Sequence, residues 1–325
     1  MAALTGTTDT YAMVGKAEDV HDMIYDISPT ETPVLTMAKR LKASSTNHQW
    51  QTDSLASAAV NAKVEGDDAT FASASPTTML SNRTMISTKT VMVSRTADSV
   101  RKYGRAKELA RLTVKYGKEL KRDIETAFVG DQGSSAGNAT TARQAAGLRA
   151  MITNFTRASG TATTFGTVGG YTSSDWTASS DSTASTLTET DVRGAIELAW
   201  IDGGNPTKLV MNSKQKRRVA AFAGATAFDG FGIAQGKGAQ GVVVGGVDYY
   251  VSDFGNHQVV LDRFIGQTAV LCLDPEYIGM AWLDPIKIED LAKTGDAEKK
   301  MLVTEYTFVS QNPDAHAQVL GCLTT

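Results

Sequence analysis

The sequence predicts an α+β fold, on three observations. Residues 97–128 carry apolar or small side chains at steps of three and four, which indicates a long amphipathic helix. In the middle of the chain, the apolar run TKLVM precedes NSKQKRRVAAFAG, which predicts a strand followed by a helix. After about residue 241, runs rich in Val, Ile and Tyr are broken by Gly, Pro, Asn and Asp, which is typical of successive strands. We therefore expect a mixed α/β region that closes onto antiparallel strands.

Residues 1–45 are expected to form an arm rather than a domain. The short amphipathic piece KAEDVHDMIYD is followed by ISPTETPVLTMAKR, in which Pro29 and Pro33 interrupt regular structure. The segment has too little apolar material to close a core, so it needs another surface to lie on.

Residues 46–96 predict a protruding β-hairpin. NHQWQTDSL and RTMISTKTVMVSRTA alternate roughly between apolar and polar residues, and they flank the polar segment VEGDDATFASASPTT. The acidic residues Glu65, Asp67 and Asp68 lie in this segment, with no histidine nearby to complete a catalytic site. A two-stranded ribbon is marginally stable alone, so we expect contacts outside it to stabilise it.

The helix expected at 97–128 would be on the order of 45 Å long at 1.5 Å per residue. Its expected apolar face comprises Tyr103, Ala106, Ala110, Val114, Gly117, Leu120, Ile124 and Ala127. The opposite face carries a basic stripe, formed by Arg101, Arg105, Arg111, Lys115, Lys118 and Arg122. Such a stripe is either a solvated face or an electrostatic surface for phosphates or an acidic neighbouring subunit, and the sequence leaves both interpretations open.

The remaining segments give weaker signals. Residues 131–187 are rich in Ser, Thr and Gly with interspersed aromatic residues, which predicts loops and short hairpins on a surface. Thr188 and Asp191 have capping-box spacing at the start of a helix that Gly203 ends. Cys272 and Cys322 lie in apolar runs and are expected to be buried free thiols.

One motif suggests nucleotide binding. GKGAQG, residues 236–241, matches G-x-G-x-x-G, but it follows a helix and leads into a strand, the reverse of the order that a dinucleotide site requires. The chain also lacks a G-x-x-x-x-G-K-[ST] loop, a G-x-S-x-G nucleophile elbow and histidine or cysteine pairs with zinc-site spacing. We expect no enzyme activity and no cofactor, and a nucleotide-binding enzyme stays as an alternative.

Composition and charge narrow the class of protein. The chain has 325 residues, 42% of them hydrophobic, and a net charge of −3, which argues against a surface devoted as a whole to nucleic acid. It contains no apolar run near the roughly 20 residues that span a bilayer, and its N-terminus lacks a basic leader and an apolar core. We expect no membrane contact and assembly in a cytosol-like compartment.

The order of elements, an arm, a hairpin, a long helix and an α/β region, resembles the major capsid proteins of tailed bacteriophages with the Hong Kong 97 fold. The resemblance covers most of the first 130 residues, including DISPTETPVLTMAKR, HQWQTDSL and SNRTMISTKTVMVSRTADSVRKYGRAKELARLTVKYGKELKRDIE. LVMNSKQKRRVAAFAG, VVVGGVDYYVSD and HQVVLDRF are similar to the succession of elements in the capsid axial domain.

The resemblance implies a domain organisation, with the following parts: an N-arm, 1–45; an extended loop, 46–96; a peripheral domain, 97–187 and 283–315, with a spine helix at 97–128; and an axial domain, 188–282 and 316–325. It implies that PIKIEDL pairs with KKMLVTEYTFVS in a long peripheral hairpin. It also implies a loop near the centre of each capsomer, with Phe228, Gly236, Lys237, Gly238 and Gly241.

The implied function is structural. Such a subunit self-assembles into pentamers and hexamers of an icosahedral shell around packaged double-stranded DNA, which the basic stripe would face. Portal, scaffolding and decoration proteins are further expected partners, the scaffold as a separate protein if present, because the arm begins almost at Met1. The protein would be located in the virion and assembled in the host bacterial cytoplasm. A cellular encapsulin-like shell protein with the same fold is the alternative.

Overall fold

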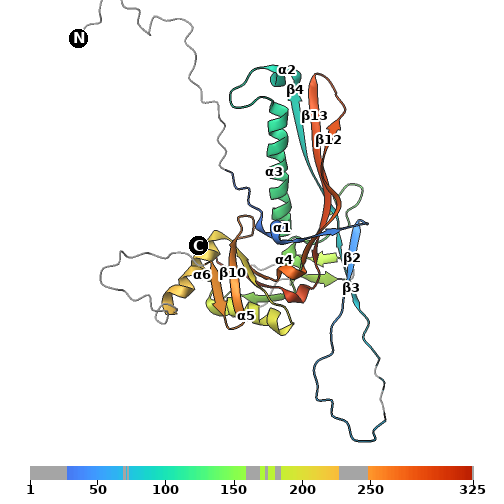
Figure 1. Cartoon of the computed structure of the whole chain (residues 1–325), viewed down its shortest axis with the longest axis vertical. Helices are drawn as coiled ribbons and strands as arrows, with labels where there is room; N and C mark the ends of the chain where they lie inside the picture. Colours follow the sequence, from blue (N-terminus) through green and yellow to red (C-terminus); the bar gives the residue numbers. More distant parts are fainter. Residues whose placement is uncertain are drawn as a thin grey trace, which may run out of the picture.

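The computed structural model describes residues 28–68, 71, 73–158, 169–172, 175–179, 184–226 and 248–323. Figure 1 shows an elongated molecule, in which a long helix and a long β-hairpin run side by side away from a compact α/β region, while a loop extends from the opposite end. Helices and strands occur together in both parts, so the α+β class is confirmed.

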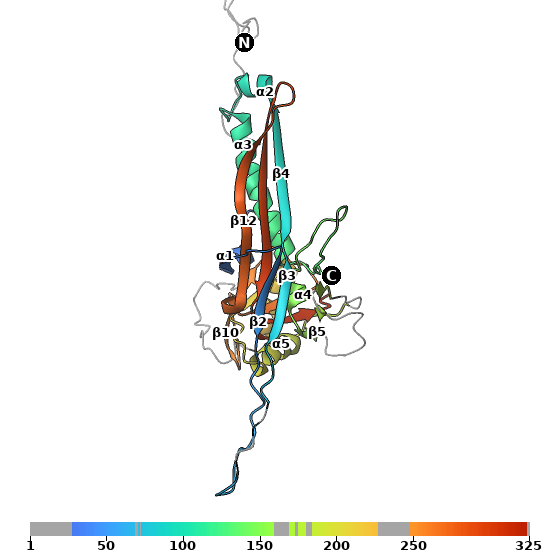
Figure 2. The ribbon, with the colours of Figure 1, turned by 90° about the vertical axis from the view of Figure 1, so that its right-hand side faces the viewer.

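A four-stranded sheet forms the long part of the molecule (Figure 2). Its order is β1 (Lys39–Lys42), β12 (Ile278–Leu291), β13 (Ala297–Ser310) and β4 (Met85–Ser94), with β1 parallel to β12 and the other pairs antiparallel. Strands β12 and β13 have 14 residues each, and they confirm the expected long hairpin. The β12–β13 register shifts on both sides of Asp284, next to Pro285, since proline cannot donate to the ladder.

The protruding hairpin pairs differently from the prediction. Strand β2 (Asn47–Thr52) pairs with β3 (Thr78–Arg83), whereas the strand predicted from residue 83 onward is β4 and pairs with β13. The expected pairing of 47–55 with 83–97 was therefore wrong. Strand β4 has a buried apolar side, with Val91 and Val93, that packs in the core beneath the long helix, so it joins the sheet that covers this core.

The long helix is shorter than predicted. Residues 97–128 form the end of α2 (Arg95–Ser99), a turn, and then α3 (Glu108–Phe128), whose 21 residues span about 32 Å. Gly104 adopts a left-handed φ of 73°, which interrupts the helix. The Asp98 Oδ1 atom accepts hydrogen bonds from the backbone N–H groups of Glu108 (2.8 Å) and Leu109 (3.4 Å). Because these are unpaired donors of a first helical turn, Asp98 fixes where α3 begins.

The buried face of α3 also differs from the prediction in its N-terminal half. Tyr103 and Val114, which were expected on the apolar face, are 57% and 63% exposed. The apolar face runs instead through Leu109, Leu112, Tyr116, Leu120, Ile124 and Phe128. The predicted periodicity started in residues 103–107, which are not helical, so its phase was correct only from Gly117 onward, where Gly117 faces the Leu302 side chain of β13.

A six-stranded sheet forms the centre of the compact region. Its order is β5 (Asn154–Arg157), β14 (Ala317–Leu320), β11 (Val270–Leu273), β8 (Lys208–Met211), β10 (Gly255–Leu261) and β9 (Tyr249–Ser252). All residues of β11 and β14 are buried, as their continuous apolar runs require. Strands β8 and β10 are parallel, and α6 (Ser213–Thr226) lies in the crossover between them.

Helix α5 (Glu189–Ile201) packs against this sheet and begins as the sequence predicts. The Thr188 backbone N–H donates to the Asp191 Oδ2 atom at 2.8 Å in a capping box. Gly203 follows the helix with a left-handed φ of 89°. Cys272 and Cys322 are buried and free, as expected.

Part of the segment at 131–187 is buried, although surface loops were predicted. The short hairpin of β6 (Gly170–Thr172) and β7 (Asp175–Thr177) is confirmed, but Trp176 is only 2% exposed. The short helix α4 (Leu148–Met151) belongs to the main core, together with Ala145, Ala146 and Ile152. The apolar run around α4 packs in the main core. The segment as a whole is polar in composition, so its average composition does not reveal this short buried run.

Three short helical turns complete the described elements: α1 (Pro33–Met37), η1 (Pro275–Tyr277) and η2 (Pro313–Ala315). The expected domain boundaries stay predictions. Two strands lie in a different sheet from most of their expected domain. Strand β5, expected in the peripheral domain, belongs to the six-stranded sheet, and β12, which begins at Ile278 in the expected axial domain, belongs to the four-stranded sheet.

Candidate assembly surfaces

The loop between β2 and β3, residues 53–77 and hereafter the extended loop, projects beyond the rest of the molecule (Figures 1 and 2). Its described residues form neither helix nor strand, and all of them are exposed. Four apolar side chains lie almost entirely in solvent, namely Leu55 (98% exposed), Val60 (96%), Val64 (80%) and Phe71 (97%). A segment of this length without secondary structure is uncommon in a compact domain, where it is usually a functional loop or a linker.

The predicted acidic residues Glu65, Asp67 and Asp68 are exposed at a turn of this loop. The Asp67 N–H donates to the Val64 carbonyl oxygen at 3.1 Å, and Gly66 adopts a left-handed φ of 85°. The turn therefore brings three acidic residues close in sequence to the exposed Val64. Apolar and acidic groups together characterise this surface.

The base of the extended loop, in contrast, is firmly held by buried hydrogen bonds. The fully buried Asn82 side chain donates from Nδ2 to the Phe308 carbonyl oxygen at 2.8 Å, and its Oδ1 atom accepts from the Ala146 N–H at 2.9 Å. The Trp176 Nε1–H donates to the Ser81 carbonyl oxygen at 2.7 Å. Strand β3 is thus fixed to three different segments.

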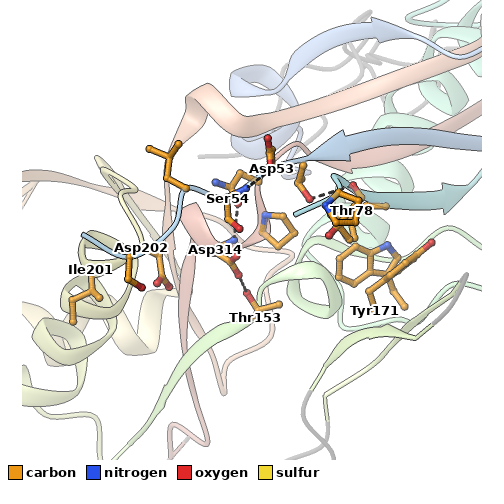
Figure 3. A pocket seen from close by; sticks show the side chains of 16 residues that line it. Asp53, Ser54, Thr78, Thr153, Tyr171, Ile201, Asp202 and Asp314 are labelled. Carbon is orange, nitrogen blue, oxygen red and sulfur yellow. Dashed lines mark hydrogen bonds between the residues drawn. The ribbon is translucent and has the colours of Figure 1, made fainter. Parts of the chain in front are cut away.

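A recess of about 710 Å³ lies where the extended loop leaves the body (Figure 3). Asp53, Asp202 and Asp314 contribute carboxylates to its lining. All three accept hydrogen bonds: Thr153 Oγ1 donates to Asp314 Oδ1 at 2.5 Å, Asn154 Nδ2 donates to Asp202 Oδ2 at 2.7 Å, and the Ser54 N–H donates to Asp53 Oδ1 at 2.9 Å. Within the described part of the chain, no group of three or more His, Cys, Asp or Glu side chains could hold a metal ion.

The basic stripe is divided by the start of α3. Arg111, Lys115, Lys118 and Arg122 lie on α3 at steps of three and four, on the side opposite Leu120, whereas Arg101 and Arg105 precede the helix. Several of these charges are partly balanced: Arg111 Nη2 lies 2.5 Å from Glu108 Oε1, Arg105 also pairs with Glu108, and Lys115 Nζ lies 3.8 Å from Glu119 Oε1. The stripe is therefore a mixed surface with a positive excess.

Two stripe residues, Arg111 and Arg122, have identifiable partners within the subunit. The Arg111 guanidinium, bonded to Glu108, lowers the pKa of that carboxyl below its ordinary value. The Arg122 guanidinium carbon lies 5.7 Å from the centre of the Phe264 ring, a cation–π geometry. Lys118 is exposed, and it has no ion pair with a described residue. Arg101 is likewise exposed without an ion pair to a described residue, so Lys118 and Arg101 are the stripe cations most available to a partner.

A buried contact joins the N-terminal arm to α3. The backbone N–H groups of Val34 and Leu35 donate to the two carboxylate oxygens of Glu125, each at 2.8 Å. Glu125 is fully buried, and burial raises its pKa to about 7. Sequence reasoning missed this residue, although a glutamate between the buried Ile124 and Phe128 is a signal that could have drawn attention to it.

Other predicted site residues lie outside the part of the chain that the structure describes. These are Phe228, Gly236, Lys237, Gly238 and Gly241. Sequence reasoning also missed Asn82 and the four exposed apolar residues of the extended loop. The latter have a sequence signal, since large apolar residues recur in a segment otherwise made of Ser, Ala, Thr and Asp.

Comparison with protein families decides the identity of the chain. A family model described as SU10 major capsid protein matches residues 4–322. The chain belongs to the SU10 major capsid protein family. This membership confirms the predicted structural subunit of a phage head, located in the virion, and it favours that interpretation over an encapsulin-like shell protein.

Individual relatives of this capsid protein agree. The chain is 40% identical to the major capsid protein of Escherichia phage Phieco32 over 123 residues, which are 38% of this chain and 35% of that relative's length. A chain of the cyanophage A-1(L) capsid asymmetric unit superposes with a TM-score of 0.70 at 12% identity, covering 98% of this chain and 99% of that one. A chain of Mycobacterium phage Bobi gives a TM-score of 0.59 at 11% identity, covering 94% and 95%. At such low identity these structures show the fold, and they confirm the expected phage-capsid fold.

No helix in the described part of this capsid protein is long and apolar enough to cross a membrane.

Proposed function

We propose that this major capsid protein assembles with copies of itself into pentamers and hexamers of an icosahedral shell that encloses double-stranded DNA, and that it performs no catalysis. The single observation that carries the proposal is the extended loop, where Leu55, Val60, Val64 and Phe71 are at least 80% exposed. Full burial of an aliphatic or aromatic side chain of this size contributes about 1.5–3 kcal/mol. Covering these four side chains with a neighbouring copy would therefore contribute several kcal/mol per contact.

The shape of the chain supports contacts between copies that form closed rings. The extended loop is fixed only at its base, through Asn82 and Ser81, and its far end points away from the body (Figure 2). When such a loop docks on a different surface of the next copy, the contact is heterologous, and heterologous contacts generate rings if the rotation closes. The carboxylates of Glu65, Asp67 and Asp68 would meet basic groups of that neighbour.

The basic stripe on α3 is the proposed DNA-facing surface. Lys118 and the neighbouring cations Arg111, Lys115 and Arg122 would neutralise phosphates, which is the sequence-independent part of binding to DNA. The loop containing residues 228–241 is proposed to lie near the capsomer axis, where glycines allow several copies to approach one another. Portal, scaffolding and decoration proteins complete the proposed partners, and assembly takes place in the host bacterial cytoplasm.

Assembly of the purified full chain tests the proposal. We expect particles tens of nanometres wide by negative-stain electron microscopy, alone or with the phage's scaffolding protein. Replacing the four exposed apolar residues by serine should leave folded subunits that do not form particles, with circular dichroism as the check on folding. The matched control, which changes polar residues of the same loop, is Ser54→Ala, Ser57→Ala, Ser73→Ala and Ser75→Ala. Particle formation by the serine variant would contradict the role of the loop.

A second experiment tests the DNA-facing stripe. Shells produced during infection with Arg111→Gln, Lys115→Gln and Lys118→Gln should retain less DNA at high salt than wild-type shells, because fewer phosphates are neutralised. Lys293→Gln, Lys299→Gln and Lys300→Gln remove the same charge at the far end of the β12–β13 hairpin and serve as the control. Equal DNA retention by the two triple variants would exclude a special role for the stripe.

A further inference from the structure

An open groove lies between the N-terminal arm and the four-stranded sheet. It has a volume of about 600 Å³, and residues of α1, β1, β12 and α3 line it. Most of these residues are apolar, including Leu41, Trp282 and Ile286, and these three side chains are only partly buried. A concave surface lined by partly exposed apolar side chains is typical of a binding site.

The charged residues that line this groove are all basic. They are Arg40 and Lys42 of β1 and Lys121 of α3, and all three are exposed. None of them forms a salt bridge with another residue in the described part of the chain. A segment that fits the groove should therefore combine apolar side chains with negative charge.

Residues 16–27, KAEDVHDMIYDI, have this combination, and they lie outside the described residues. Their apolar residues recur at steps of three and four, which predicts one apolar face of a helix, comprising Ala17, Val20, Ile24 and Ile27. The acidic residues fall outside that face, and they are Glu18, Asp19, Asp22 and Asp26. With four acidic residues and one lysine, the segment has a net charge of −3.

The connection between this segment and the groove is short. Residues 28–31 link Ile27 to Thr32, which lines the groove. The five Cα–Cα steps from Ile27 to Thr32 span at most about 18 Å, and a helix of 12 residues is also about 18 Å long. The arm is held at this point, since Glu125 of α3 accepts two backbone N–H groups of α1 at 2.8 Å each. The segment therefore begins within reach of the groove.

We propose that residues 16–27 bind in the groove of their own chain as an amphipathic helix, with the apolar face on the apolar lining and the carboxylates near the three basic residues. The extended loop of a second copy also combines apolar and acidic side chains. The covalent connection favours the arm, because it gives the segment an effective concentration on the order of millimolar at the groove. The inference does not depend on shell assembly, because segment and groove belong to one subunit.

Hydrogen exchange of dissociated, full-length subunits tests this docking. A helix of 12 residues is marginal in isolation, so slow exchange in residues 18–27 reports binding to the groove. In the wild type, these amides should exchange at least about tenfold more slowly than their intrinsic rates. The variant with Arg40→Glu, Lys42→Glu and Lys121→Glu should lose this protection, because segment and groove then repel each other.

The matched control makes the same change of charge at exposed cations outside the groove. It carries Lys63→Glu, Arg101→Glu and Arg217→Glu, and it should keep the protection of residues 18–27. Loss of protection in this control as well would mean that total charge, rather than the groove, determines the effect, and it would overturn the proposal.

A charge swap separates direct contact from an indirect effect of the substitutions. The changes Glu18→Lys, Asp19→Lys and Asp22→Lys should remove the protection when made alone and restore it in the reversed groove variant. Failure of this restoration would overturn the proposal, as would unprotected amides in the wild type or unchanged protection in the reversed groove variant. Protection that appears only at high subunit concentration, in residues 18–27 or in the extended loop, would also overturn it, because a second copy would then occupy the groove.

Discussion

The six-stranded sheet and the extended loop are opposite cases within one chain. Every residue of β11 is buried, whereas every described residue of the extended loop is exposed, including large apolar side chains such as Leu55 and Phe71. Strand β11 finds all its partners within the subunit. Among the described residues the extended loop has no packing partner beyond its base, and a neighbouring copy is the proposed cover for its apolar residues. The same hydrophobic effect stabilises the subunit in one region and, under the proposed assembly, would act between copies in the other.

The sharpest test of this contrast is a matched pair of leucine substitutions. Leu271→Ala in β11 should lower the free energy of unfolding by about 2–5 kcal/mol, since the side chain is fully buried. Leu55→Ala, at a residue that is 98% exposed, should change it by less than about 0.5 kcal/mol and reduce particle formation instead. Urea unfolding of dissociated subunits and light scattering measure the two effects. Similar losses of stability in both variants would contradict the proposed difference between a residue that stabilises the subunit and one that acts in assembly.

A substitution at the base of the extended loop, where β3 joins the core, should lower the free energy of unfolding almost as much. Asn82→Ala removes the partner of the Phe308 carbonyl oxygen and of the Ala146 N–H, and it should cost about 2–3 kcal/mol because these groups stay buried. Urea unfolding measures the loss. Asn61→Ala in the exposed loop is the matched control and should have no measurable effect on stability. A stable Asn82→Ala subunit would mean that the loop base is not held in this way.

Acid should affect the sheet region through His316. This histidine is fully buried, and burial lowers its pKa from 6.5 to about 3. The unfolded chain therefore binds the proton more readily, so stability falls as pH drops below about 6.5, by about 1.4 kcal/mol per pH unit from this group. Between pH 6.5 and pH 5, the wild type should lose about 2 kcal/mol relative to His316→Asn in urea unfolding. A constant difference between the two proteins would refute this assignment.

The smallest predicted effect concerns the start of α5. Thr188→Ala removes the capping side chain and should lower the free energy of unfolding by about 1 kcal/mol. Thr77→Ala in the extended loop makes the same chemical change at an exposed residue, and it should stay within about 0.5 kcal/mol of the wild type. Thermal unfolding of both variants checks this difference, which vanishes if the capping box does not contribute.

The sequence predicted the elements whose signals are local. The capping box at Thr188 and the strand and helix of β8 and α6 follow from residue types and periodicity within each segment, whereas the β12–β13 pairing was expected from the family resemblance. The family resemblance rested on the order of these elements, and the family match confirms it.

What the sequence did not predict depends on distant contacts. The start of α3 is fixed by Asp98 and by the left-handed Gly104, so periodicity alone placed the helix too early. The choice of β3 rather than β4 as the partner of β2 depends on which strand covers the core. Glu125 accepts a hydrogen bond from the Val34 N–H, about 90 residues away in the sequence, and no local pattern encodes that contact.

The measurement that tests the central claim most directly is hydrogen exchange of residues 53–77 in dissociated subunits and in assembled shells. If neighbouring copies cover the extended loop, its amides should exchange rapidly in the subunit and become strongly protected in the shell, while β8 and β11 remain protected in both. If the loop exchanges equally fast in both states, its apolar residues are not the assembly surface, and the contrast between the two regions has no role in assembly.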